Sequence, residues 1–284
     1  MTLTPRDLVI TLRSIASPPE VYVKVTNVLD NPLWQPTEVA DVIEKDVSLT
    51  ARILKTVNSP FYGLTRTVAT ISEAVPVVGA ADLRNIVLIT SVLETFAGIP
   101  AEFLSMREFW RRSLRCGVLA EIIAGRLDQR VNPRALFVAG LLHDIGSLVV
   151  CLKLPELARE ALLHYSPAAS RVPLSVECAV LGAEHAAVGY ELLSLWNLPE
   201  LLQEAVGYYP VPERASTHCV AAATVHLANR ISYELEMGQR DPIASVPSHA
   251  SAWELCGLMP NALGGVAEEA QQRFEMALGL FSIS

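Results

Sequence analysis

The residues best suited to chemistry are the adjacent pair His143 and Asp144, inside the segment Gly140-Leu-Leu-His-Asp-Ile-Gly146. An imidazole nitrogen and a carboxylate oxygen can bind one divalent metal when a helix turns both side chains into the same pocket, and these ligands suit Zn, Mn or Fe. A bare His-Asp pair is weak evidence. The apolar run before the pair, and a glycine expected to end or bend the helix after it, make this segment a specific metal-binding pattern.

Helices must position this pair, because helix-start signals recur along the chain. Thr4-Pro5-Arg6-Asp7 combines a capping hydroxyl, a proline at the first helical position and an acid three residues after the cap. Thr70–Glu73 and Ser105–Glu108 fit the capping-box pattern, and Asn132-Pro133 places a proline at a helix start. The sequence lacks the Asn-Gly and Asp-Gly turns and the strict apolar alternation that indicate hairpins and strands. It therefore predicts an all-α fold.

Apolar periodicity predicts a long helix before the His-Asp pair. From Phe109, apolar or small residues recur on one helical face at Ser113, Cys116, Ala120, Ile123 and Leu127. Gly98 and Pro100 interrupt the helical pattern ahead of the cap at Ser105. The sequence therefore predicts two packed helical bundles, residues 1–100 and 101–284, with a loop at residues 238–250.

Composition limits the classes of function. Of the 284 residues, 51% are apolar and only 18% are charged, so the chain buries a large core or exposes an apolar surface to a partner. The net charge of −8 disfavours direct nucleic-acid binding. We find no charge-free apolar run of about 20 residues and no signal peptide, so we expect no membrane association and a cytoplasmic location.

The five cysteines support a reducing compartment. Their number is odd, they are widely spaced, and they form neither a disulfide framework nor a Cys-x-x-Cys zinc pattern. Each lies among apolar neighbours, so we expect buried, reduced thiols at Cys116, Cys151, Cys178, Cys219 and Cys256.

Several further stretches accompany the His-Asp segment: Asp46–Gly63, Thr70–Gly79, Phe109–Ser113, Glu184–Gly189 and Leu195–Pro199. Together they resemble the HDOD branch of the HD phosphohydrolase superfamily, which comprises helical signalling modules related to metal-dependent hydrolases. The resemblance covers about residues 15–235. It implies a second bundle with an HD-hydrolase-like fold.

The resemblance also implies a set of metal ligands, and this chain departs from it. HD hydrolases use a histidine on an earlier helix, the His-Asp pair and a later aspartate. Here His143 is the first histidine of the chain, Arg112 stands at the apparent position of the earlier ligand, and Asn229 stands at the later one. Asp241, in the loop, is the only aspartate after Asp144. Tyr208-Tyr209 stands where relatives often have paired histidines.

We therefore predict a degenerate pocket formed by Arg112, His143, Asp144, His185 and Asn229, without a catalytic residue, resident metal or cofactor. The Arg112 guanidinium is expected to pair with Asp144 in place of a metal. If a metal binds at all, its ligands should be His143, Asp144 and His185. A plain structural interpretation stays open for His185, as a hydrogen-bonded core histidine.

These features predict a non-catalytic bacterial regulatory module. It would act through a small ligand or through a signalling protein in trans, of the receiver or cyclic-dinucleotide type, and a second copy of the chain is a further expected partner. The turn that holds Asn58, Ser59, Phe61 and Tyr62 is a candidate partner surface, although a rigid structural turn is favoured. The alternatives are a metal-dependent phosphohydrolase acting on a nucleotide or phosphate ester and, less favoured, a nucleic-acid-associated regulator.

Overall fold

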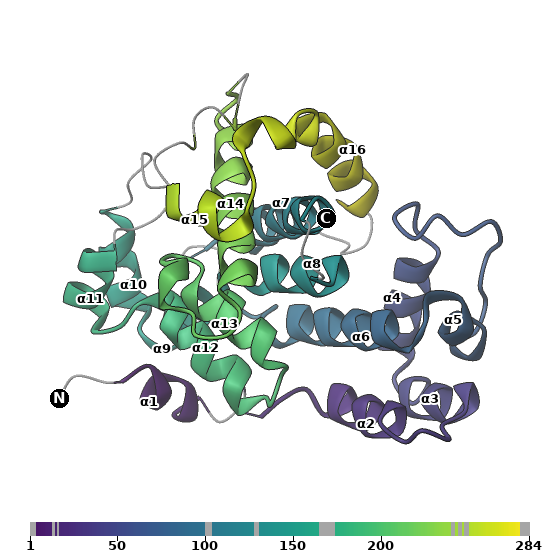
Figure 1. Cartoon of the computed structure of the whole chain (residues 1–284). Coiled ribbons are helices and arrows are strands. Elements are labelled where there is room, and N and C mark those ends of the chain that lie inside the picture. Colours follow the sequence, from purple (N-terminus) through teal and green to yellow (C-terminus); the bar gives the residue numbers. More distant parts are fainter. Residues whose placement is uncertain are drawn as a thin grey trace. The chain divides into compact units, whose positions relative to one another are not determined.

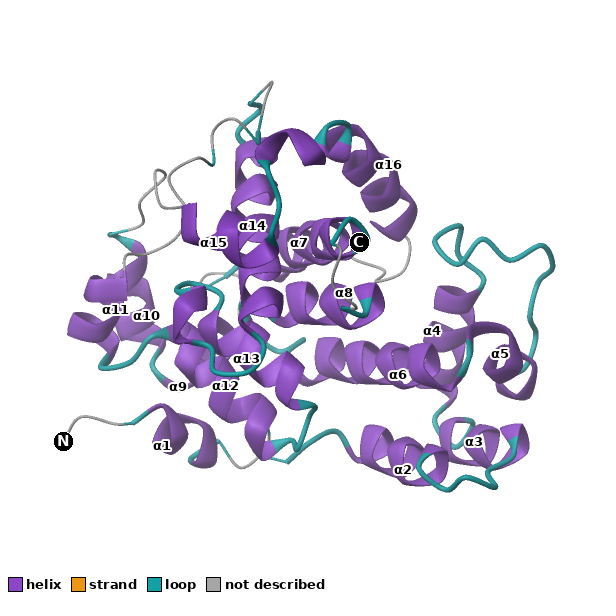
Figure 2. Cartoon of the chain, viewed as in Figure 1, coloured by secondary structure: helices purple, strands orange, loops and turns teal. Residues whose placement is uncertain are grey.

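The computed structural model describes residues 4–12, 15, 17–99, 104–127, 131–164, 174–239, 242–243, 246 and 250–278. Throughout these ranges the regular secondary structure is helical, and no strand is present in them (Figure 2). The predicted all-α fold is therefore confirmed. The predicted loop at residues 238–250, including Asp241, falls largely outside the described residues.

The chain forms two compact units, Met1–Ala16 with Ile99–Gln271, and Ser17–Gly98 with Gln272–Ser284. The helices of the first unit, called the site unit below, are α1 (Pro5–Ile10), α7 (Met106–Ala124), α8 (Pro133–Leu142), α9 (Ile145–Lys153), α10 (Pro155–Leu162), α11 (Leu174–Leu181), α12 (His185–Leu195), α13 (Glu200–Tyr208), α14 (Cys219–Glu236) and α15 (Ala250–Cys256), with short 3-10 turns at Pro212–Arg214 and Pro260–Leu263. In the site unit, α7 packs on α8 and α14, and α12 packs on α9 and α13 (Figure 1). The unit boundary falls inside α16 (Val266–Leu278).

The second unit contains α2 (Glu20–Leu29), α3 (Pro36–Ile43), α4 (Val47–Val57), α5 (Ile71–Val78) and α6 (Ala80–Thr95). Helix α2 packs on α3 and α6, and α5 packs on α3, α4 and α6. Gly79 separates α5 from α6 with a φ of 83°, in the left-handed region that favours glycine. This single residue lets the chain turn by 120° between the two helices.

The first 16 residues lie in the site unit, whereas the sequence-based division at residue 100 placed them in the N-terminal bundle. The physical reason is apolar burial, because Leu8 and Val9 of α1 are fully buried and α1 packs on α12 and α9. The indole Nε1–H of Trp196 also donates to the carbonyl of Ile15 at 2.8 Å. Cap signals locate helix starts, but they do not say which bundle a short amphipathic helix joins.

The predicted helix starts match the structure. Ser105 Oγ accepts from the amide of Glu108 at 3.3 Å, at the start of α7. Thr4 forms a capping box with Asp7, and Thr70 accepts from the amide of Glu73. The predicted inward face of α7 is buried at Ser113, Cys116, Ala120 and Ile123.

The segment Pro133–Lys153 is long and apolar enough to cross a membrane, although Arg134, Asp144 and Lys153 prevent it from being a charge-free run. In the structure 78% of its apolar window is buried inside the protein. The segment is also divided into α8 and α9 at His143 and Asp144. Because most of their residues are buried, α8 and α9 are core helices of the site unit.

The turn proposed as a partner surface is held from inside the second unit. The side-chain amide of Asn58 donates to the carbonyl of Val68 at 2.8 Å and accepts from the Val68 amide at 2.7 Å. Ser59 is buried, and the rings of Phe61 and Tyr62 meet edge to face. These contacts explain the rigidity of the turn, and they leave its role as a partner surface a proposal.

The cysteines only partly match the expected burial. Cys116, Cys151 and Cys256 are buried, and burial raises the pKa of the Cys151 and Cys256 thiols to about 11. Cys178 is exposed and Cys219 is half-buried, so the expectation was wrong at Cys178 and only partly met at Cys219. The helix of Cys178, α11, turns Glu177 and Leu181 inward, and a neighbouring position lies about 100° away on the helix surface.

Glu204 caps the start of α14 and should make stability depend on pH. Its carboxylate accepts from the Ser216 hydroxyl and from the amides of Ser216, Thr217 and His218. Burial alone would raise the pKa of Glu204, but these hydrogen bonds outweigh it and hold the pKa below the ordinary value of 4.5. The stabilisation is therefore fully present above about pH 4.5 and is lost as the pH falls through the folded-state pKa.

We expect Glu204→Gln to lower the free energy of unfolding at pH 7 by about 1–2 kcal/mol, the usual value of a helix cap. Urea unfolding of both proteins from pH 7 to pH 3 measures this effect. The difference should shrink below pH 4.5, because wild-type Glu204 then becomes protonated. A difference that stays constant down to pH 3 would contradict a charged cap.

Candidate functional site

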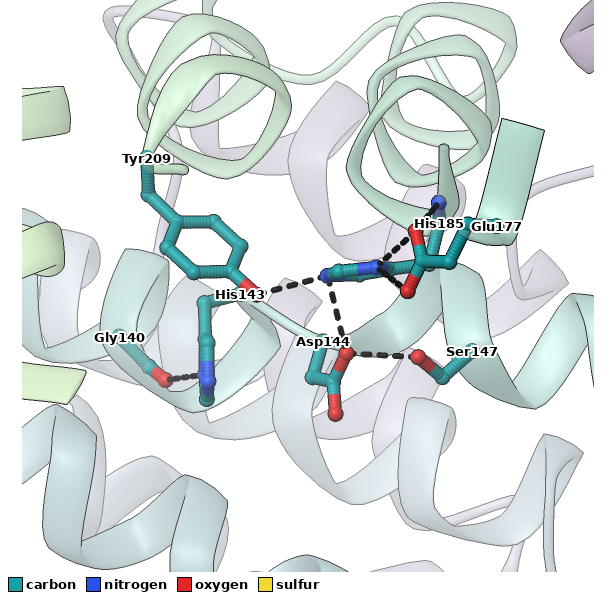
Figure 3. A network of polar contacts seen from close by, with 7 residues as sticks. All are labelled: Gly140, His143, Asp144, Ser147, Glu177, His185 and Tyr209. Atoms are coloured by element: carbon teal, nitrogen blue, oxygen red, sulfur yellow. Dashed lines mark hydrogen bonds and ion pairs between the residues drawn. The ribbon is translucent and has the colours of Figure 1, made fainter. Parts of the chain in front are cut away.

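The predicted pocket exists as a cavity of about 440 Å³ inside the site unit. All five predicted residues, Arg112, His143, Asp144, His185 and Asn229, line it. Its apolar wall includes Phe109 of α7, Val150 of α9 and Leu181 of α11. Figure 3 shows the polar side of the cavity, where side chains from the α8–α9 junction, α11 and α12 meet Tyr209.

His143 is held at the end of α8 by its own helix. Its Nδ1 lies 2.7 Å from the carbonyl oxygen of Gly140, so this nitrogen carries the proton and donates. The Tyr209 ring meets the imidazole edge to face at 5.0 Å, and the Asn229 side chain hydrogen-bonds to it. Burial is the main cause that lowers the pKa of His143, which keeps the imidazole neutral at pH 7.

Asp144 starts α9 and points toward the cavity (Figure 3). Its Oδ1 accepts from the Ser147 hydroxyl at 2.6 Å and lies 3.4 Å from His185 Nε2. The side chain is 34% exposed. Asp144 is therefore the partly open carboxylate of the site.

Both ring nitrogens of His185 are engaged by protein groups. Nδ1 lies 2.7 and 2.8 Å from the two Glu177 oxygens, and the His185 backbone amide donates to the same carboxylate at 3.0 Å. Nε2 lies 2.7 Å from the Tyr209 hydroxyl (Figure 3). Glu177 and His185 are both at most 5% exposed. The chain Glu177–His185–Tyr209 therefore joins α11, α12 and the end of α13 through buried hydrogen bonds.

Gly146 has a different role from the one expected. It lies inside α9 and does not end the helix. A Cβ added to Gly146 would overlap the carbonyl oxygen of His185 and lie 2.6 Å from the amide nitrogen of Gly189. The residue therefore lets α9 and α12 cross closely enough to bring Asp144 to His185.

The expected ion pair between Arg112 and Asp144 is absent, so that prediction was wrong. Arg112 Nε instead donates to Glu236 of α14 at 3.0 Å, and its side chain is 56% exposed. The packing of α14 on α7 brings Glu236 within reach of Arg112. Beside Glu236 the guanidinium keeps much of its hydration, which burial next to Asp144 would remove.

The donors present do not fit a bound metal. His143, Asp144 and His185 share the cavity, but the Tyr209 hydroxyl occupies Nε2 of His185, the nitrogen left for a metal once Glu177 holds Nδ1. Nδ1 of His143 donates to Gly140, so only Nε2 of that ring could bind a metal. Within the described ranges, no three His, Cys, Asp or Glu side chains are grouped so that they could hold a metal ion.

Comparison with known proteins gives the family. The HDOD domain family matches residues 15–212. The chain belongs to the HDOD domain family. An HDOD domain protein of unknown function from Geobacter sulfurreducens has a TM-score of 0.70 and 24% sequence identity, with 98% of each chain covered. A protein from Shewanella amazonensis SB2B, whose name proposes a phosphohydrolase, has a TM-score of 0.74 and 24% identity, covering 96% of this chain and 97% of its own.

The identities to these structures support the fold of this HDOD protein and no shared activity. A curated relative, an uncharacterized protein of Treponema pallidum (strain Nichols), is 25% identical over 212 residues, which cover 74% of this chain. The HDOD chain spans 40% of the length of that relative. The comparisons therefore establish the HDOD family and its fold.

Sequence reasoning missed two residues that shape the site of this HDOD protein, Glu177 and Tyr209. Glu177 lies eight residues before His185 in a different helix, so spacing alone gave no sign of the contact. Tyr209 was noted only as a replacement for a family histidine. The sequence did contain one signal for Glu177. It is an acid between Val176 and Cys178, and an acid in an apolar stretch usually needs a partner when it is buried.

Proposed function

We propose that this HDOD protein is a non-catalytic signal-transduction module whose degenerate metal site serves as a binding cavity. The observation that carries the proposal is the saturation of His185 by Glu177 and Tyr209. His185 can ligate a metal through Nε2 only after the Tyr209 hydroxyl is displaced, which leaves a buried hydroxyl without its partner. We therefore propose that the polar side chains of the cavity stabilise the fold and contact a bound ligand.

A regulatory module needs a partner protein to which it passes its signal. We propose a signalling protein acting in trans, of the receiver or cyclic-dinucleotide type, with a cytoplasmic location and without membrane or nucleic-acid contact. The negative net charge of the chain supports a partner other than nucleic acid. The turn at Phe61 and Tyr62 remains the proposed partner surface, because Asn58 holds it in one conformation.

The alternative proposal is a metal-dependent phosphohydrolase, supported only by the presence of His143 and Asp144 in one cavity. Metal analysis of the purified protein and turnover of bis(p-nitrophenyl) phosphate with added Mn²⁺ or Zn²⁺ separate the two proposals. We expect less than stoichiometric metal and no turnover above background. Stoichiometric metal with turnover that Asp144→Asn abolishes would refute the non-catalytic proposal.

A triple variant serves as the positive arm of this experiment. Arg112→His, Asn229→Asp and Tyr209→Phe together add two ligands and release His185 Nε2 from its hydroxyl partner. We expect this variant to bind more Zn²⁺ or Mn²⁺ than the natural protein, since three to four N and O ligands are the usual requirement.

A further inference from the structure

The cavity of the site unit contains more carboxylates than cations. Asp144, the buried Glu177 and the exposed Glu108 line it, and among its described lining residues Arg112 is the only lysine or arginine. The charge of Arg112 is already balanced by Glu236 at 3.0 Å. Because a cavity has a lower effective dielectric than water, this excess of carboxylates favours a positively charged guest over an anion.

One carboxylate is placed to contact such a guest. Oδ1 of Asp144 is used by Ser147 and lies near His185. Oδ2 accepts no hydrogen bond from the part of the chain that the structure describes, and it lies away from both partners in Figure 3. An ammonium group placed there would gain a charge-assisted hydrogen bond.

A second polar group in the cavity, the hydroxyl of Ser113, lacks a hydrogen-bond partner among the described residues. Ser113 of α7 is 1% exposed and lines the cavity. Its hydroxyl makes no hydrogen bond to any residue that the structure describes. Hydroxyls in protein interiors normally have a hydrogen-bond partner, and a polar atom of a guest in the cavity could supply one for Ser113. This hydroxyl is independent of the acidic residues, and it indicates that the cavity is built to hold a guest with polar atoms.

The remainder of the cavity is apolar. Phe109, Val150 and Leu181 contribute to its wall, and its volume of about 440 Å³ lies in the usual range for small-molecule sites. A hydrated inorganic ion would leave this wall in contact with water. The shape and lining therefore suit an organic molecule with an apolar body and one polar end.

We propose that the cavity binds a small organic cation, an amine whose ammonium group contacts Asp144 and whose apolar body lies against Phe109, Val150 and Leu181. Ser113 provides a second hydrogen bond near the polar end. The proposal rests on the proposed function, because it names the class of ligand that the non-catalytic module would sense. A phosphate ester is disfavoured by the same carboxylates.

Three matched probes test the proposal on the full chain: tryptamine as the cation, tryptophol as the neutral analogue and indole-3-propionate as the anion. Titration of the ¹⁵N-labelled protein gives the dissociation constant and the location of each probe. Tryptamine should bind in the cavity at least about tenfold more tightly than the other two, as a charged hydrogen bond predicts. Asp144→Asn should remove this preference. Asp41→Asn, the same change on the exposed surface of α3, should leave it intact.

Stronger binding of indole-3-propionate, no binding of any probe, or a preference that survives Asp144→Asn would overturn the proposal. If Asp144→Asn fails to fold, Ser113→Ala supplies the test, with an expected weakening of tryptamine binding by about threefold. Metal content and phosphodiester turnover are measured on the same sample. Turnover with a bound metal would refute the proposed function, whereas loss of amine preference without turnover refutes only the ligand class.

Discussion

Replacing Gly146 by alanine is expected to destabilise the protein by about 3 kcal/mol or more, at the upper end of overpacking effects. The added methyl group would overlap the backbone carbonyl of His185 and lie 2.6 Å from the Gly189 amide nitrogen. Both neighbours are backbone atoms, so no side chain can rotate away. Helix α12 must shift from α9, and the shift separates His185 from Asp144.

Urea unfolding followed by circular dichroism measures the loss, and Gly125→Ala is the matched control. Gly125 ends α7 with a φ of −66°, and an added Cβ there would meet nothing closer than 3.5 Å. Its replacement should change stability by less than about 1 kcal/mol, with stabilisation the favoured direction. If the two variants unfold at the same urea concentration, the absence of a side chain at Gly146 is not required for α9 and α12 to cross.

Replacing Glu177 by alanine is expected to cost about 3–5 kcal/mol, as for other buried charged partners that are removed. The change leaves two buried donors, the amide and Nδ1 of His185, without their acceptor. Glu177→Gln should cost less, because its amide oxygen can still serve one of them. The imidazole and amide NMR signals of His185 report which donor keeps its bond.

Glu184→Gln is the control for this series, because it changes another glutamate next to α12. Glu184 pairs with Arg214 at 3.3 Å near the surface, where an ion pair contributes less than about 1 kcal/mol. The expected order of destabilisation is Glu177→Ala, then Glu177→Gln, then Glu184→Gln. Equal losses for Glu177→Ala and Glu184→Gln would mean that the Glu177–His185 contact does not stabilise the fold.

Much of the fold could be predicted from local signals. The caps at Thr4, Thr70 and Ser105 and the apolar face of α7 depend on residues within one or two helical turns. Such interactions are encoded in adjacent sequence, so pattern alone locates them. The same local signals gave the position of His143 and Asp144 at a helix junction.

The pairings inside the site could not be predicted in the same way. Whether Arg112 meets Asp144 or Glu236 depends on how α7 packs on α14, and Glu236 lies 124 residues from Arg112. Pairing with Glu236 is favoured because the Arg112 guanidinium loses less hydration there than it would beside Asp144. Gly146 likewise reads as a helix breaker in sequence, and only the crossing of α9 with α12 reveals why a side chain is excluded there.

The apolar segment Pro133–Lys153 has a consequence for synthesis of the chain. Helices α12 and α13, which pack on α9 and α8, end at Tyr208, so they leave the ribosome 55 residues after Lys153. At about 5–20 residues per second, this interval lasts about 3–10 s. During it, a stretch with the composition of a membrane span lacks much of its cover. Asp144, in the middle of the segment, raises the free energy of inserting it into a bilayer during this interval.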